Sequence, residues 1–129
     1  ADLENCDAAG LGRAIRLHPQ FQPRGINVNF TKVLAPGHIA VRTFEFGVEA
    51  ETLACGTGSA SAAIVSVLRH GWKGQYSCGG EPVRVDVRGG ETLKVWFEMQ
   101  ADGTIAGVCL ETRVRTVYRA TLAPEFRPV

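Results

Sequence analysis

Residues 57–70, which read Thr-Gly-Ser-Ala-Ser-Ala-Ala-Ile-Val-Ser-Val-Leu-Arg-His, are the stretch that decides the fold. Apolar residues recur there at the i, i+3, i+4 spacing that places side chains on one face of an α-helix. They are Ala60, Ala63, Ile64, Val67 and Leu68. Ala62 and Val65 make most of the circumference apolar, so the helix is expected to be buried. Gly71 then provides a C-terminal stop.

The segments on both sides of this helix carry strand patterns. Residues 26–34 alternate apolar and polar side chains, with Asn27, Asn29 and Thr31 on one side. Pro36-Gly37 is a turn signal, and it predicts a hairpin between this strand and a second one at residues 38–46. After the helix, strands are predicted at residues 83–88, 93–99, 105–110 and 113–122.

Before the first strand, Asp7 is a candidate N-cap for a short helix over residues 8–17, and Pro19 ends it. One mostly buried helix among about six antiparallel strands predicts an α+β fold, with the sheet curled around a central helix. A chain of 129 residues fits a single domain, residues 1–129. The first residues show no charged-then-apolar leader, so a signal peptide is not expected.

Composition excludes several classes of function. The formal net charge is +1, from 14 basic and 13 acidic residues, without a long basic run. Binding to nucleic acid or to a membrane surface is therefore not expected. Cysteines stand at positions 6, 55, 78 and 109, in no C-x-x-C or metal-finger spacing. We expect reduced thiols in a cytoplasmic protein.

Cys55 stands where the predicted helix begins, with Gly56 and Gly58 after it. Glycines let other atoms approach the backbone closely, and the free N–H groups and dipole of a helix N-terminus favour anions. The thiolate should therefore form more easily there, as a base or nucleophile requires, and the N–H groups could hold a carboxylate. A small apolar residue at a tight turn would also suit this position, so placement alone leaves both interpretations open.

Arg42-Thr43-Phe44-Glu45 followed by residues 51–58, Glu-Thr-Leu-Ala-Cys-Gly-Thr-Gly, resembles the second catalytic-cysteine motif of diaminopimelate epimerases. Residues 11–16, 18–21 and 25–30 are similar to the segments that precede this motif in that family. The resemblance runs in order through about residues 10–70, and the cysteine block is highly specific.

The resemblance implies an enzyme that interconverts the LL and meso forms of diaminopimelate, a step towards lysine and peptidoglycan, without pyridoxal phosphate or metal. Two cysteines face opposite sides of the α-carbon, and one removes the proton while the other returns it. By the same resemblance Cys55 is one of these cysteines, and Gly56 and Thr57 offer backbone N–H groups to the α-carboxylate. Asn27 hydrogen-bonds the substrate, and Glu45 contacts its amino group and tunes the site.

Each of these roles has a simpler alternative. Asn27 could satisfy its own loop at the start of a strand, Glu45 could be a solvated strand carboxylate, and Thr57 could be only a helix cap. Phe46 occupies the substrate-binding position where the family usually carries arginine. An aromatic ring cannot replace the forked hydrogen bonds of a guanidinium, so strict specificity for diaminopimelate is less secure.

The family consists of two similar halves, each giving one cysteine to a cleft, and this chain shows one such motif. It resembles the C-terminal half, which alone should be unable to run the two-base reaction. Its expected partners are the small-molecule substrate and either the missing N-terminal half or a second copy, as a homodimer. The alternatives are another isomerase of this fold, of proline racemase or phenazine-pathway type, and a non-catalytic module for dimerisation or carboxylate binding.

Overall fold

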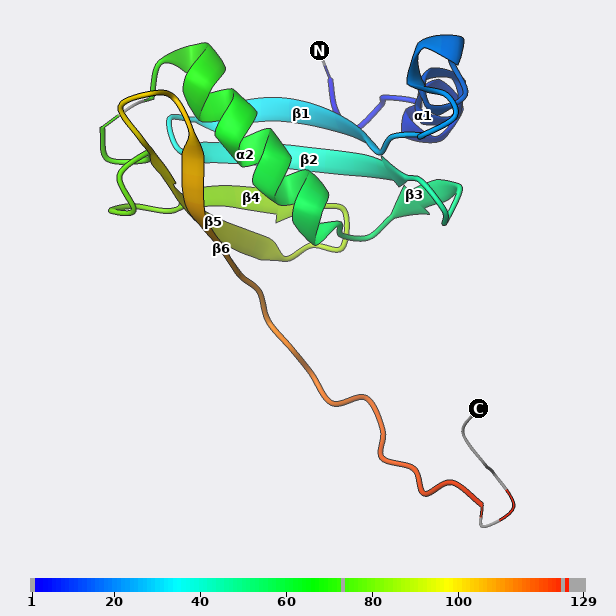
Figure 1. Cartoon of the computed structure of the whole chain (residues 1–129). Coiled ribbons are helices and arrows are strands. Elements are labelled where there is room, and N and C mark those ends of the chain that lie inside the picture. Colours follow the sequence, from blue (N-terminus) through cyan, green and yellow to red (C-terminus); the bar gives the residue numbers. More distant parts are fainter. Residues whose placement is uncertain (1, 73, 124, 126–129) are drawn as a thin grey trace.

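The computed structural model describes residues 2–72, 74–123 and 125. Two α-helices and a single 3₁₀ turn lie within this part of the chain: α1 (Ala8–Arg16), η1 (Pro19–Phe21) and α2 (Gly56–His70). The strands are β1 (Val28–Ala35), β2 (His38–Glu45), β3 (Ala50–Thr52), β4 (Val83–Val87), β5 (Thr92–Met99) and β6 (Ile105–Glu111). Figure 1 shows one sheet with α2 lying across it.

The strands form one open sheet in the order β1-β2-β4-β5-β6, and β3 pairs with β2 off this path. The neighbours are antiparallel except for β2 and β4, which are parallel. A parallel pair needs a crossover connection, and the segment that contains α2 provides it. The predicted α+β fold with a mostly antiparallel sheet is confirmed, whereas the parallel pair was not predicted.

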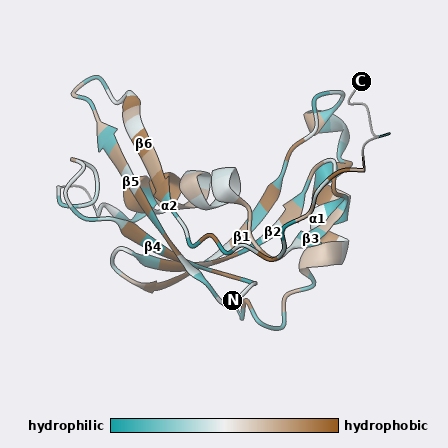
Figure 2. Cartoon of the chain, turned by 90° about the horizontal axis from the view of Figure 1, so that it is seen from below, coloured by the Kyte–Doolittle hydropathy of each residue, from teal (hydrophilic) through white to brown (hydrophobic). Residues whose placement is uncertain are grey.

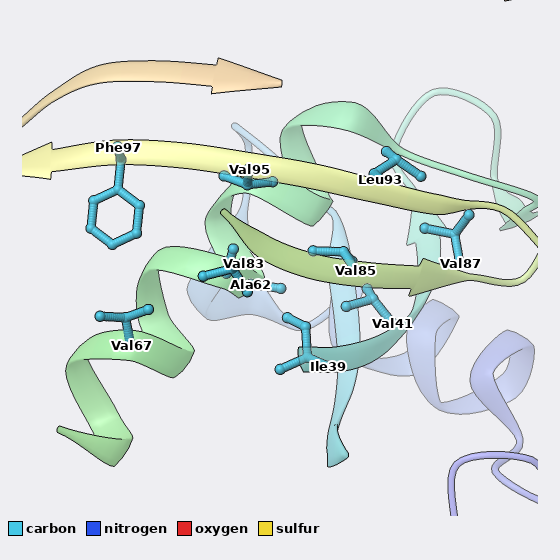
Figure 3. Close-up of a cluster of buried hydrophobic side chains, with 11 residues drawn as sticks. Ile39, Val41, Ala62, Val67, Val83, Val85, Val87, Leu93, Val95 and Phe97 are labelled. Atoms are coloured by element: carbon cyan, nitrogen blue, oxygen red, sulfur yellow. The ribbon is translucent and has the colours of Figure 1, made fainter. Parts of the chain in front are cut away.

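The core lies between α2 and one face of the sheet, as Figure 3 shows. Strands β2, β4 and β5 and helix α2 contribute its buried side chains: Ile39, Val41, Ala62, Ala63, Val67, Val83, Val85, Val87, Leu93, Val95 and Phe97. On β4 and β5 every second residue is buried, as expected for strands with one covered face. Figure 2 shows the sheet as a bent layer with α2 in the bend.

Helix α2 is buried along one side only. Ala63 and Val67 are inaccessible to solvent, whereas Val65 is 59% exposed and Leu68 is 42% exposed. The prediction of burial around most of the circumference is therefore wrong for Val65 and Leu68. The physical reason is that the sheet is open and contacts the helix from one side. Gly71 ends the helix in the left-handed conformation, as predicted, with φ +69°.

The structure differs from the predicted strands in two places. Strand β3 was not predicted, because three residues are too few to show an alternating pattern. Residues 113–122 were predicted to form a strand, but the described residues after β6 are outside any strand and extend away from the sheet (Figure 1). Val117 is 88% exposed there. An alternating pattern forms a strand only where a neighbouring strand can hydrogen-bond to it.

None of the helices in the described part of the chain has the length and apolar character needed to cross a membrane.

Candidate active site at the start of helix α2

Cys55 is the N-cap residue of α2. Its backbone is extended, with φ −132° and ψ 113°, and its carbonyl accepts the first helical hydrogen bond from the N–H of Ser59 at 2.9 Å. Its sulfur accepts from the N–H of Gly58 at 3.4 Å, in the way that a serine or aspartate cap would. The residue is only 6% exposed. The chain thus places a thiol, with little freedom to move, at the positive end of a 15-residue helix.

Two polar side chains join Gly58 around this sulfur. The hydroxyl Oγ1 of Thr57 lies 3.5 Å from Sγ, and the amide nitrogen Nδ2 of Asn27 lies 3.6 Å from it. Asn27 immediately precedes β1 and the other two residues belong to the first turn of α2. Gly58 and Asn27 donate to this sulfur, whereas in the contact with Thr57 either atom can be the donor.

A small cavity opens beside these groups. Its volume is about 280 Å³, and it is lined by Ile26, Asn27, Asn29, Thr57, Gly58 and Ser61. The first N–H groups of a helix have no partner within the helix, so an anion at this end finds donors ready for it. The arrangement can hold a carboxylate next to a sulfur atom.

Gly58 allows strand β1 to approach the start of α2. A Cβ atom at this position would lie 2.4 Å from Oδ1 of Asn29 and 3.3 Å from Sγ of Cys55. Oδ1 of Asn29 also accepts a hydrogen bond from the hydroxyl of Thr43 at 2.8 Å, which holds it in place. Asn29 is a site residue that the sequence analysis did not single out. The alternation that put it on the same side as Asn27 was the available signal.

A buried ion pair fixes the strand that leads to Cys55. The guanidinium of Arg42 donates to both carboxylate oxygens of Glu51, at 2.6 and 2.7 Å. Its third nitrogen donates to the backbone carbonyls of Leu3, Glu4 and Cys6. The hydrogen bond from Arg42 lowers the pKa of Glu51, and the same bond raises the pKa of Arg42. Arg42 thereby ties β2, β3 and the N-terminal segment together.

Phe46 follows β2 and reaches the site through its backbone, whose N–H donates to Oδ1 of Asn27 at 2.8 Å. The residue is 46% exposed, and the guanidinium carbon of Arg16 lies 4.7 Å from the centroid of its ring. Nε of Arg16 also donates to Glu49 at 2.8 Å. The guanidinium of Arg16, from α1, therefore lies next to Phe46, where it stacks on the ring and pairs with the carboxylate of Glu49.

The structure brings five of the predicted site residues together: Asn27, Phe46, Cys55, Gly56 and Thr57. Glu45 ends β2 next to Phe46 and is half-buried, and within the described residues its carboxylate forms no ion pair. All four cysteines are free thiols. In residues 2–72, 74–123 and 125, no three acidic, histidine or cysteine side chains are grouped so as to hold a metal ion.

The sequence of this chain is similar to those of known proteins. The profile of the family described as diaminopimelate epimerase matches residues 1–108. The diaminopimelate epimerase of Aquifex aeolicus is 49% identical over 124 residues, which cover 96% of this chain and 41% of that protein. The one from Chlorobaculum tepidum is 42% identical over 121 residues, covering 94% of this chain and 43% of that protein.

The chain spans about two fifths of the length of these curated relatives. The matched residues include the whole of β1, β2, β3 and α2, and with them every residue around the sulfur of Cys55. The chain belongs to the diaminopimelate epimerase family.

Proposed function

We propose that this chain supplies one of the two acid/base cysteines of a diaminopimelate epimerase that works without a cofactor, in the cytoplasm, on the route to lysine. The observation that carries the proposal is the position of Cys55. Its sulfur lies at the N-terminus of α2, within hydrogen-bond distance of Asn27, Thr57 and Gly58. Membership of the family supports the assignment of the reaction.

In the proposed reaction the thiolate of Cys55 takes the α-proton from one face of the substrate. The C–H bond breaks, an S–H bond forms, and the electron pair stays on the α-carbon and its carboxylate. A second cysteine thiol then gives a proton to the opposite face, which inverts the configuration. The backbone N–H groups of Gly56 and Thr57, at the positive end of α2, bind the carboxylate on which negative charge develops.

The contact with the far end of the substrate is the part of the proposal that Phe46 affects. Its ring gives no hydrogen bond to a second carboxylate. Arg16 lies over this ring, and it is the cation that we propose for the distal carboxylate. Because Phe46 replaces the usual arginine, another isomerase of the same fold is the second candidate. Proline and other amino acids with a single carboxylate should therefore be assayed as substrates beside diaminopimelate.

The second cysteine comes from outside the site described here. Of the other cysteines, Cys109 is exposed on β6, and Cys78 is exposed beside Glu98 of β5. Cys6 lies beside the Arg42 ion pair. We propose that the half absent from this chain provides the second cysteine, and the alternative donor is a second copy of the chain.

The experiment is epimerisation by complementation. The chain is assayed alone and together with the part of the Aquifex aeolicus enzyme that it does not span, and chiral chromatography follows conversion of LL- to meso-diaminopimelate. We expect conversion by the mixture, and roughly thousandfold slower conversion when Cys55→Ser replaces the wild-type chain. Equal rates with Cys55→Ser, or a mixture that converts proline and leaves diaminopimelate unchanged, would contradict the proposal.

A further inference from the structure

Asn27 lies between two parts of the site that are distant in the sequence. Its carbonyl oxygen Oδ1 accepts the backbone N–H of Phe46 at 2.8 Å, and its amide nitrogen Nδ2 lies 3.6 Å from Sγ of Cys55. One carboxamide therefore connects the turn after β2 to the cysteine that begins α2.

The orientation of this carboxamide follows from the chemistry of its neighbours. The backbone N–H of Phe46 is only a donor, so the carbonyl oxygen of Asn27 must face it. The NH₂ group is then left facing the sulfur, and an amide NH₂ can only donate. A thiolate accepts a hydrogen bond more strongly than a neutral thiol because it is charged. The contact from Asn27 therefore favours the ionised form of Cys55.

Gly58 and Thr57 also contact the sulfur, but both belong to the helix that Cys55 caps. Their contacts form whenever α2 forms. Asn27 comes from a different part of the chain, and the backbone of Phe46 determines where its amide points. Its contact with the sulfur therefore depends on the position of the turn after β2.

Charged groups on the neighbouring elements are mostly paired elsewhere. Glu51 of β3 is held by Arg42, and Glu111 of β6 by Lys94. Glu45 ends β2, and the remaining titratable groups of β1 and α2 are Lys32, Arg69 and His70. The described hydrogen bonds of the sulfur are to uncharged groups, so an added charge at position 27 would change its surroundings strongly.

We infer that Asn27 is a positioning residue for the proposed reaction: its amide donates to the sulfur of Cys55, which stabilises the thiolate that the reaction requires, and aligns the sulfur with the turn that carries Phe46. This inference rests on the proposed role of Cys55 and adds a function for Asn27 that does not involve contact with the substrate. It predicts that the ionisation of Cys55 depends on Asn27 even when no substrate is present.

The test is the pH dependence of alkylation by iodoacetamide, with the full chain and no substrate. Mass spectrometry of the peptide that contains Cys55 gives the rate at each pH, and peptides with Cys78 and Cys109 serve as internal references. Because it removes one donor, Asn27→Ala should move the midpoint of the Cys55 profile upward by about half a pH unit or more. Asn27→Asp should move it further, because one carboxylate oxygen still accepts from Phe46 while the other repels the thiolate.

Gln75→Ala is the matched control, because it removes a carboxamide that lies outside the site and donates to Glu81 at 3.1 Å, not to the sulfur. Its midpoint should equal that of the wild type. Coincident midpoints for the wild type, Asn27→Ala and Asn27→Asp would overturn the inference. If Asn27→Ala does not fold, the midpoint of Asn27→Asp tests the inference by itself, since this variant retains the hydrogen bond to the N–H of Phe46. Alkylation needs no diaminopimelate, so a shifted midpoint without epimerisation would refute the proposed reaction alone.

Discussion

At the scale of single residues, the site depends on a small side chain in the first turn of α2. Gly58 stands where β1 and α2 are so close that any Cβ atom would overlap Oδ1 of Asn29. The backbone there is helical, so the glycine is required for space and not for an unusual conformation. Cys55 caps the same turn, and its sulfur accepts the backbone N–H of this glycine at 3.4 Å.

Gly58→Ala should separate stability from activity. Alanine favours a helix over glycine by about 1 kcal/mol, which offsets part of the cost of the clash. The clash itself must push Asn29 or the start of α2 away, and a shift of about 1 Å in a catalytic group can cost about a hundredfold in rate. We expect a large loss of kcat in the complementation assay with a change of only about 1 kcal/mol in the free energy of unfolding.

Gly71→Ala is the control for Gly58→Ala, because it should lower stability without lowering kcat. Gly71 is in the left-handed conformation with open space around it, so alanine there costs about 1 kcal/mol of stability and leaves the site intact. Wild-type kcat in Gly58→Ala would show that the approach of Asn29 to α2 is not part of the site.

At the scale of elements, the ion pair between Arg42 and Glu51 joins the two strands that lead to Cys55. Both side chains are largely buried, and Arg42 additionally holds three carbonyls of the N-terminal segment. Removing one partner of a buried pair leaves the other charge without compensation, which costs about 3 kcal/mol. The pair therefore contributes to the fold and keeps β3 in register with β2.

This pair gives the stability of the chain a defined pH dependence. The pKa of Glu51 is lowered from its ordinary value of 4.5 in the folded state, mainly by the hydrogen bond from Arg42. Unfolding raises it again, so the stabilisation is complete above about pH 4.5 and is lost as the pH falls through the folded pKa. Urea denaturation at neutral and acidic pH should show Glu51→Gln less stable at pH 7, with the difference from wild type shrinking below pH 4.5. A difference that stays constant across this range would contradict the assignment.

The sequence predicted α1, α2, the hairpin of β1 and β2, and strands β4 to β6 because each carries a local pattern. It missed β3, and it missed the parallel pairing of β2 with β4, because pairing depends on where α2 returns the chain. The burial of α2 was overestimated for a similar reason, since periodicity reports an apolar surface but not what covers it. For the site, the resemblance supplied Cys55, Asn27 and Thr57, whereas Asn29 and the Arg42 ion pair needed three-dimensional contacts.

At the scale of the whole molecule, the sheet is open and the chain spans about two fifths of its relatives. Strands β1 and β6 are its two edges, and α2 leaves Val65 and Leu68 exposed between them. The proposed reaction needs a second acid/base group on the other face of the substrate, which this site alone does not contain. We therefore propose that Cys55 is a working half of a two-base site.

The most direct test follows the α-proton of diaminopimelate by NMR in deuterated water. The chain is incubated with LL- and meso-diaminopimelate, alone and with the complementing part of the Aquifex aeolicus enzyme, and Cys55→Ser is the control. We expect exchange of the α-proton by the complemented wild-type chain and its loss in Cys55→Ser. Exchange that persists unchanged in Cys55→Ser would contradict it, because the proton would then be removed by another group.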